Sequence, residues 1–209
     1  MRILSFTLSF LLFPLVSGSW ATPTKKRIAD AAYVDKVASS LFYRHLRIKE
    51  AITSMQKDPR LPDALKQITL SSKYRTIQRI RAMWGLQYIS KTVAKTAYIK
   101  LLQQPKLKQV LLRNALNAFQ IHFKKEALPY ALKHLKNQDV TIREVAIDII
   151  QKHPSVQGLQ QLTLHLKVEK SKFLLRRGHL ALKTLQLWKR TQPTLKKPHI
   201  KKPTPKKQK

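Results

Sequence analysis

One pattern recurs along this sequence at a nearly constant step: an aliphatic residue followed directly by arginine. After the first residues it occurs five times, at Leu46-Arg47, Ile80-Arg81, Leu112-Arg113, Ile142-Arg143 and Leu175-Arg176. The steps between successive arginines are 34, 32, 30 and 33 residues. A step of this size within apolar, helix-like segments is typical of helical hairpins stacked one on another. The sequence therefore predicts an all-α fold, a right-handed α-solenoid of about five stacked helical hairpins.

The clearest unit runs over residues 126–153. Its first helix, 127–135, has apolar residues at helical spacing, and Asp139 in the following turn is a good N-cap. The second helix carries apolar residues at positions i, i+3, i+4, i+7 and i+8, which are Ile142, Val145, Ala146, Ile149 and Ile150. That spacing predicts one buried stripe along the helix.

This unit resembles a HEAT repeat, with a first helix of the form "alpL..aL", an Asp-containing turn, and a second helix that opens "hRe.A...h". Three neighbouring helix pairs are similar in outline, and residues 29–55 are expected to form a degenerate terminal repeat that caps the array. The resemblance covers residues 30–190 and implies a HEAT-like solenoid over that range. An irregular helical bundle is the alternative.

The N-terminus has the pattern of a secretory signal peptide. A short positive start precedes an apolar run over residues 3–16, and small residues follow at the −3 and −1 positions, Ser19 and Ala21. Cleavage is predicted after Ala21, with Gly18 as the second choice. The protein is therefore expected to be exported, either periplasmic or secreted.

Residues 25–27, Lys-Lys-Arg, complicate that prediction because basic residues just beyond an apolar run oppose translocation. The alternative is an uncleaved N-terminal membrane anchor. Residues 22–29 would then be a short linker in either case. The other end of the chain, 191–209, is rich in Lys and Pro and has no acidic residue. It is predicted to be a disordered basic tail that contacts anionic surfaces non-specifically.

Charge is the strongest functional signal. Lys and Arg outnumber Asp and Glu by 42 to 10, which gives a formal net charge of +32. Such an excess points to an acidic partner: nucleic acid, an anionic lipid surface, an anionic envelope polymer or an acidic protein. A merely solvated basic protein is the alternative. The chain has no cysteine, which excludes disulfides, thiolate metal sites and cysteine nucleophiles.

The HEAT resemblance implies that each repeated arginine pairs with an aspartate of the preceding turn. Only Asp139 stands four residues before its arginine, Arg143. We therefore expect the other arginines of the series to attract an external anion near the positive end of a helix dipole. Acids elsewhere in the chain could instead accommodate them. The candidate binding residues are Arg47, Lys73, Tyr74, Arg75, Arg79, Arg81, Lys108, Arg113, Arg143, Lys172, Arg176 and Arg177.

Catalytic and metal-binding patterns are not evident in the sequence. The seven histidines lack the spacing of a zinc site, and no Gly-rich phosphate loop or nucleophile elbow occurs. Glu144 and Asp148 share a helix face, where we expect them to be solvated or to form salt bridges rather than to act in acid–base chemistry. No cofactor, metal or small-molecule substrate is predicted, and the oligomeric state is left open.

These features favour a non-enzymatic binding or scaffold protein that grips an acidic partner with a basic solenoid surface. The alternative is a HEAT-like DNA-binding enzyme of the alkylpurine DNA glycosylase type, and a HEAT-like phycobilin lyase is a third. Tyr74 is the aromatic residue expected to contact a ligand, whereas Trp84 and Trp188 are expected to pack in the core.

Overall fold

The computed structural model describes residues 28–41 and 47–192, which form α-helices joined by short loops. The predicted all-α fold is confirmed, and these residues contain no strand. The helices in chain order are α1 (Ala31–Ser40), α2 (Ile48–Met55), α3 (Leu61–Leu70), α4 (Thr76–Ile89), α5 (Lys91–Leu102), α6 (Gln109–Phe123), the short 3₁₀ helix η1 (Lys124–Ala127), α7 (Leu128–His134), α8 (Val140–Lys152), α9 (Val156–Leu166) and α10 (Lys172–Thr191). The predicted signal peptide, and the basic tail from residue 193 onward, lie outside the described residues.

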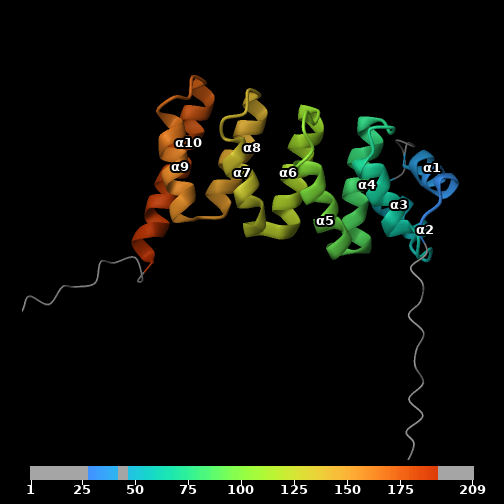
Figure 1. Ribbon diagram of the computed structural model, residues 1–209. Helices are drawn as coiled ribbons and strands as arrows, with labels where there is room; N and C mark the ends of the chain where they lie inside the picture. Colours follow the sequence, from blue (N-terminus) through green and yellow to red (C-terminus); the bar gives the residue numbers. More distant parts are fainter. Residues whose placement is uncertain (1–27, 42–46, 193–209) are drawn as a thin grey trace, which may run out of the picture.

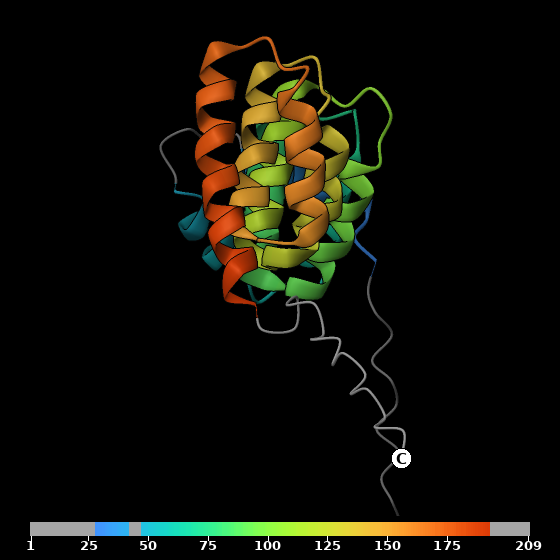
Figure 2. The same ribbon diagram turned by 90° about the vertical axis from the view of Figure 1, so that its left-hand side faces the viewer.

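The helices run alternately in opposite directions and form two layers (Figures 1 and 2). In one layer α2 contacts α4, α4 contacts α6, α6 contacts α8, and α8 contacts α10. In the other layer α1 contacts α3, α3 contacts α5, and α7 contacts α9. Figure 2 looks along this array from the α9–α10 end, with one layer on each side.

Polar caps set where several helices begin. Asp30 accepts a hydrogen bond from the Tyr33 backbone N–H at 2.8 Å, and Ser155 accepts one from Gly158 at 2.8 Å. Asp139 is the N-cap of α8, as predicted, and Ser171 caps α10. Such caps satisfy backbone donors that the first helical turn leaves without partners.

The core runs between the two layers. All five members of the predicted stripe on α8 are buried, from Ile142 to Ile150. Farther along the array, Tyr98 is fully buried and donates a hydrogen bond to the Met83 carbonyl at 2.8 Å. Its ring meets that of Phe119 edge-on at 6.2 Å between centroids. Each buried aliphatic or aromatic side chain of this kind contributes about 1.5–3 kcal/mol.

Alternation of helix direction fixes what lies at each edge. Because α4, α6, α8 and α10 run the same way, the loops that precede them lie along one edge, the upper one in Figure 1. These loops are residues 71–75, 103–108, 135–139 and 167–171. We call these four loops, with the first two turns of the four helices, the loop edge.

Candidate functional site

Side-chain contacts connect successive segments of the loop edge. Arg79 near the start of α4 donates to Gln104 Oε1 in the next loop at 3.0 Å. Arg143 near the start of α8 donates to Glu169 in the last loop. Between these pairs, Thr141 hydrogen bonds lower the pKa of Asp139, and the nearby positive charge of Arg113 lowers it further. The loop edge is therefore one continuous surface.

The five arginines of the repeating pair do not occupy equivalent positions on it. Arg47 is itself an N-cap, whereas Arg143 lies four residues, Arg113 and Arg176 five residues, and Arg81 six residues after the N-cap of its helix. Each residue along a helix turns the side chain by about 100°. This corrects the expectation that the five would line a common surface in one row, because helix starts shift against the repeat by one or two residues.

Arg79 is the structural counterpart of Arg143, although it is outside the repeating pattern. Both stand four residues after an N-cap. Arg79 Nε donates to the Thr69 carbonyl at 3.0 Å, and Arg143 Nη1 donates to the Asn137 carbonyl at 2.8 Å. Arg79 thus ties the end of α3 to the next loop, and Arg143 ties the 135–139 loop to the one after it. Since Arg79 is only 7% exposed, it holds the fold and is not open to a partner.

Arg143 also departs from the predicted pairing. Its guanidinium binds both oxygens of Glu169, at 2.7 Å from Nε and 2.9 Å from Nη2. Asp139 instead accepts hydrogen bonds from the backbone N–H and the hydroxyl of Thr141, each at 2.7 Å. Glu169 is 26 residues from Arg143, so spacing within one unit could not reveal it.

Glu169 is the centre of a buried polar cluster. Its side chain is 2% exposed and accepts backbone hydrogen bonds from Lys170 at 3.0 Å and Ser171 at 2.9 Å. The hydrogen bonds from Arg143 are the main cause of its pKa falling to about 2. His165 Nε2 lies 3.0 Å from Glu169 Oε2, and burial lowers the pKa of this histidine.

A hollow of about 370 Å³ opens beside this cluster. Its walls are formed by Lys136, Asn137, Arg143, His165, Val168, Glu169 and Lys170. A carboxyl group with a pKa of about 2 is a weak base, and its oxygens already accept from Arg143 and two backbone groups. The cluster is suited to joining two loops rather than to proton transfer.

Lys73 and Tyr74, two of the predicted contact residues, both bind one carboxylate at the protein surface. Lys73 Nζ lies 2.9 Å from both oxygens of Asp35 on α1, and the Tyr74 hydroxyl donates to Asp35 at 2.8 Å. Burial and the bond to Asp35 raise the pKa of Tyr74 to about 12. Tyr74 therefore links the 71–75 loop to α1 through Asp35, instead of presenting its hydroxyl to the ligand that it was expected to contact.

Arg177 likewise binds within the protein. Its Nε and Nη2 lie 2.8 and 2.7 Å from the two oxygens of Asp148, and Glu144 is 3.6 Å away. Glu144 and Asp148 thus form salt bridges, as expected, and they join α8 to α10. All ten carboxylates of the chain have a partner of this kind, as a hydrogen bond or an ion pair within the described residues.

The remaining predicted residues present their charge to solvent. Lys108, Arg113, Lys172 and Arg176 are exposed, and no Asp or Glu of the described residues lies within 4.0 Å of them. Arg47 is exposed and lies 4.0 Å from Glu50. Arg75 is an exposed N-cap, and Arg81 is half-buried on α4. The exposed cations, not the whole series, are the candidates for binding.

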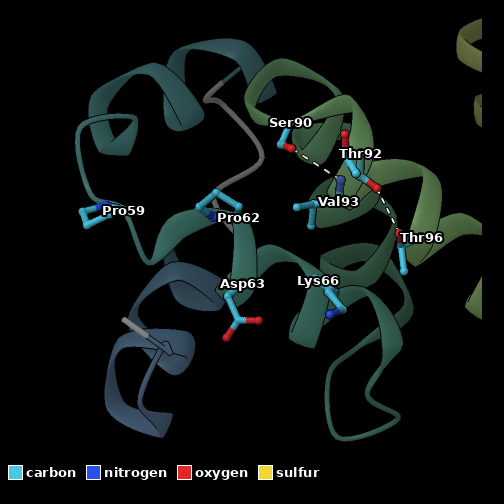
Figure 3. A pocket seen from close by; sticks show the side chains of 8 residues that line it. All are labelled: Pro59, Pro62, Asp63, Lys66, Ser90, Thr92, Val93 and Thr96. Carbon is cyan, nitrogen blue, oxygen red and sulfur yellow. Dashed lines mark hydrogen bonds between the residues drawn. The ribbon is translucent and has the colours of Figure 1, made fainter. Parts of the chain in front are cut away.

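A second hollow, of about 280 Å³, lies at the opposite edge between α3 and α5 (Figure 3). Three of its polar side chains have internal partners. Ser90 accepts from the Val93 backbone N–H at 3.4 Å, Thr96 donates to the Thr92 carbonyl at 3.0 Å, and Asp63 accepts from Gln67 at 2.9 Å. The Ser90 bond caps α5, and Asp63 also accepts from the Ala29 backbone N–H at 3.3 Å, which holds α3 to the N-terminal segment.

Among the described residues no cluster of three or more His, Cys, Asp or Glu is placed to hold a metal ion. In the same part of the chain, no helix combines the length and apolar character needed to cross a bilayer. Comparison with protein-family models, with curated proteins and with solved structures finds no match to this chain.

Proposed function

We propose that this protein is a non-enzymatic binding module that captures an acidic partner with the exposed cations of its loop edge. The observation that carries the proposal is the imbalance in how the charges are used. All ten carboxylates have internal partners, whereas Lys108, Arg113, Lys172 and Arg176 have no carboxylate within 4.0 Å among the described residues. A surface whose cations form no internal salt bridge is the form expected of a polyanion-binding protein.

Repulsion among the excess positive charges of the protein would be reduced when an anionic partner binds. The described residues carry thirty Lys and Arg against ten Asp and Glu, a formal excess of +20. Excess charge of one sign destabilises the compact state, and salt screens it over about 8–10 Å. A bound polyanion would relieve the same repulsion and would release counter-ions as it binds.

The scaffold we propose is a right-handed, HEAT-like α-solenoid. Its support is the recurrence of one contact along the chain. Arg79 and Arg143 stand 64 residues apart, which is two steps of about 32, and each binds a preceding carbonyl and a side chain of the following loop. Stacked units that touch only their neighbours produce such recurrence and offer an extended surface to a partner.

We further propose that the protein is exported through its N-terminal leader. This rests on the sequence pattern of residues 1–21 alone. Expression with and without these residues, followed by fractionation and N-terminal sequencing, tests it. A new N-terminus at Thr22 outside the cytoplasm supports export, and retention of Met1 in a membrane fraction supports the anchor instead.

The binding proposal is tested by titrating the full chain with inorganic polyphosphate and, separately, with poly-glutamate. If four cations make contacts, the affinity for polyphosphate should fall roughly 50- to 100-fold between about 50 and 200 mM salt. The melting temperature should rise with polyphosphate at low salt. Failure to bind either polymer at low salt would contradict the proposal.

A further inference from the structure

A row of exposed apolar side chains runs along the loop edge. Ile77, Val110 and Phe173 each stand two residues after the N-cap of α4, α6 and α10, and Val140 stands one residue after the N-cap of α8. Their exposed fractions are 47, 54, 53 and 41%. One such side chain is ordinary at a protein surface, but its recurrence in the first turn of four neighbouring helices of one layer forms a connected feature.

The direction of these side chains places them at the loop edge. A Cα–Cβ bond in a helix tilts toward the N-terminus, so residues of the first turn lean toward the loop edge. Val168, which is 68% exposed, adds a fifth apolar group from the 167–171 loop. The α4, α6, α8 and α10 helices begin along the same edge in Figure 1, so one extended surface can approach all of them.

The charges around this row are cationic. Exposed lysines stand in or beside the same loops: Lys106, Lys108, Lys136, Lys170 and Lys172. The acidic side chains at or near the loop edge already have partners within the protein. Glu169 is buried against Arg143, Asp139 caps α8, and the Asp35 carboxylate beneath the 71–75 loop is bound to Lys73. Apolar tips flanked by lysines, with the nearby acids engaged in ion pairs or hydrogen bonds, complement an anionic lipid interface.

We propose that the loop edge docks on the surface of an anionic lipid bilayer. This rests on the proposed function and names its partner. The apolar residues from Ile77 to Phe173 would enter the headgroup region, while the lysines contact lipid phosphates. The tips stand on separate helix starts, so a deformable surface can receive all of them at once. A nucleic acid makes few favourable contacts with the aliphatic side chains Ile77, Val110 and Val140, because its sequence-tolerant contacts are made with stacked aromatic rings.

The absence of cysteine makes a site-specific test simple. In the full chain, Val110→Cys carries an environment-sensitive fluorophore at the row, and Lys152→Cys carries it at the opposite edge. With vesicles of phosphatidylcholine and phosphatidylglycerol, the label at 110 should shift to the blue and be quenched by lipid-attached quenchers. The label at 152 should keep its aqueous spectrum. Because both chains contain the leader, insertion of the leader cannot produce this difference.

The second measurement separates lipid docking from polyanion binding. The triple variant Ile77→Ser, Val110→Ser, Phe173→Ser keeps every lysine, and its sites are exposed. It should bind anionic vesicles at least tenfold more weakly than the parent while its affinity for inorganic polyphosphate is unchanged. Unchanged vesicle affinity with an aqueous label at 110 would overturn lipid docking and leave polyanion binding standing. If the parent chain does not bind polyphosphate, that result would instead contradict the proposed function.

Discussion

Arg143 and Glu169 form a bidentate ion pair that joins the loop before α8 to the loop before α10, with N–O distances of 2.7 and 2.9 Å. Both side chains are mostly withdrawn from water. Removing one partner of such a pair costs more than the pair contributes, because the other charge is left buried. The stability of the α7–α10 end should therefore depend on this contact.

The variant Glu169→Gln tests this dependence through pH. The folded carboxyl has a pKa of about 2, below its ordinary 4.5, so its stabilisation is complete above pH 4.5 and is lost as the pH falls toward 2. The variant should be less stable by roughly 3 kcal/mol at pH 7. That difference should vanish near pH 2, as chemical denaturation across this range would show. A pH-independent difference would mean that shape, not charge, is what Gln fails to reproduce.

Substitutions of Arg79 and Arg176 should differ in their effect on stability, although both arginines were predicted to bind a partner. Arg79→Met leaves the Thr69 carbonyl and Gln104 without their donor in a buried place and should cost about 2–4 kcal/mol. Arg176→Gln, at an exposed position, should change the free energy of unfolding by less than about 0.5 kcal/mol. Equal effects in urea denaturation would contradict the division between structural and exposed cations.

Gly178 is required by the close approach of α10 to α9. A Cβ built at this position would overlap Leu166 Cδ2 and would lie 3.0 Å from Cδ1, so the leucine must move. Gly178→Ala should destabilise the protein by about 1–3 kcal/mol, despite the better helix propensity of alanine. A thermal melt measures this, and a second substitution, Leu166→Ala, should make room for the added methyl group and reduce its cost. Stabilisation by Gly178→Ala alone would show that the two helices can separate freely.

Sequence patterns predicted the helices and several of their details. The i, i+3, i+4 stripe of α8 is buried and Asp139 is its cap, because both depend on residues close in the chain. The Arg79–Gln104 and Arg143–Glu169 contacts were missed because their partners lie 25 and 26 residues away. Local periodicity carries no information about such pairs.

The arginine repeat did not predict where each arginine lies on its helix, for a related reason. A nearly constant step in sequence predicts a repeating unit, but loops of different length shift each arginine by one or two positions around its helix. The sequence does not predict the apolar row, because large apolar residues such as Ile77 and Phe173 in an amphipathic segment are expected to be buried in the core. Only the exposed fractions, 47 and 53%, distinguish them from buried neighbours.

The most direct test of the binding account compares two variants of equal charge. One carries Gln in place of the exposed loop-edge cations Lys108, Arg113, Lys172 and Arg176. The other carries Gln at four exposed lysines near the opposite edge, Lys57, Lys91, Lys125 and Lys152. Both lose four charges, so a difference between them reports position and not net charge.

The quantity to measure is the affinity for inorganic polyphosphate of each variant over a series of salt concentrations. The loop-edge variant should bind at least tenfold more weakly than the parent at low salt, and its salt slope should fall by about 3, as four lost contacts require. The opposite-edge variant should retain most of the parent's affinity and most of its salt slope. Equal losses in the two variants would show that net charge alone attracts the polyanion, which would contradict a binding site at the loop edge.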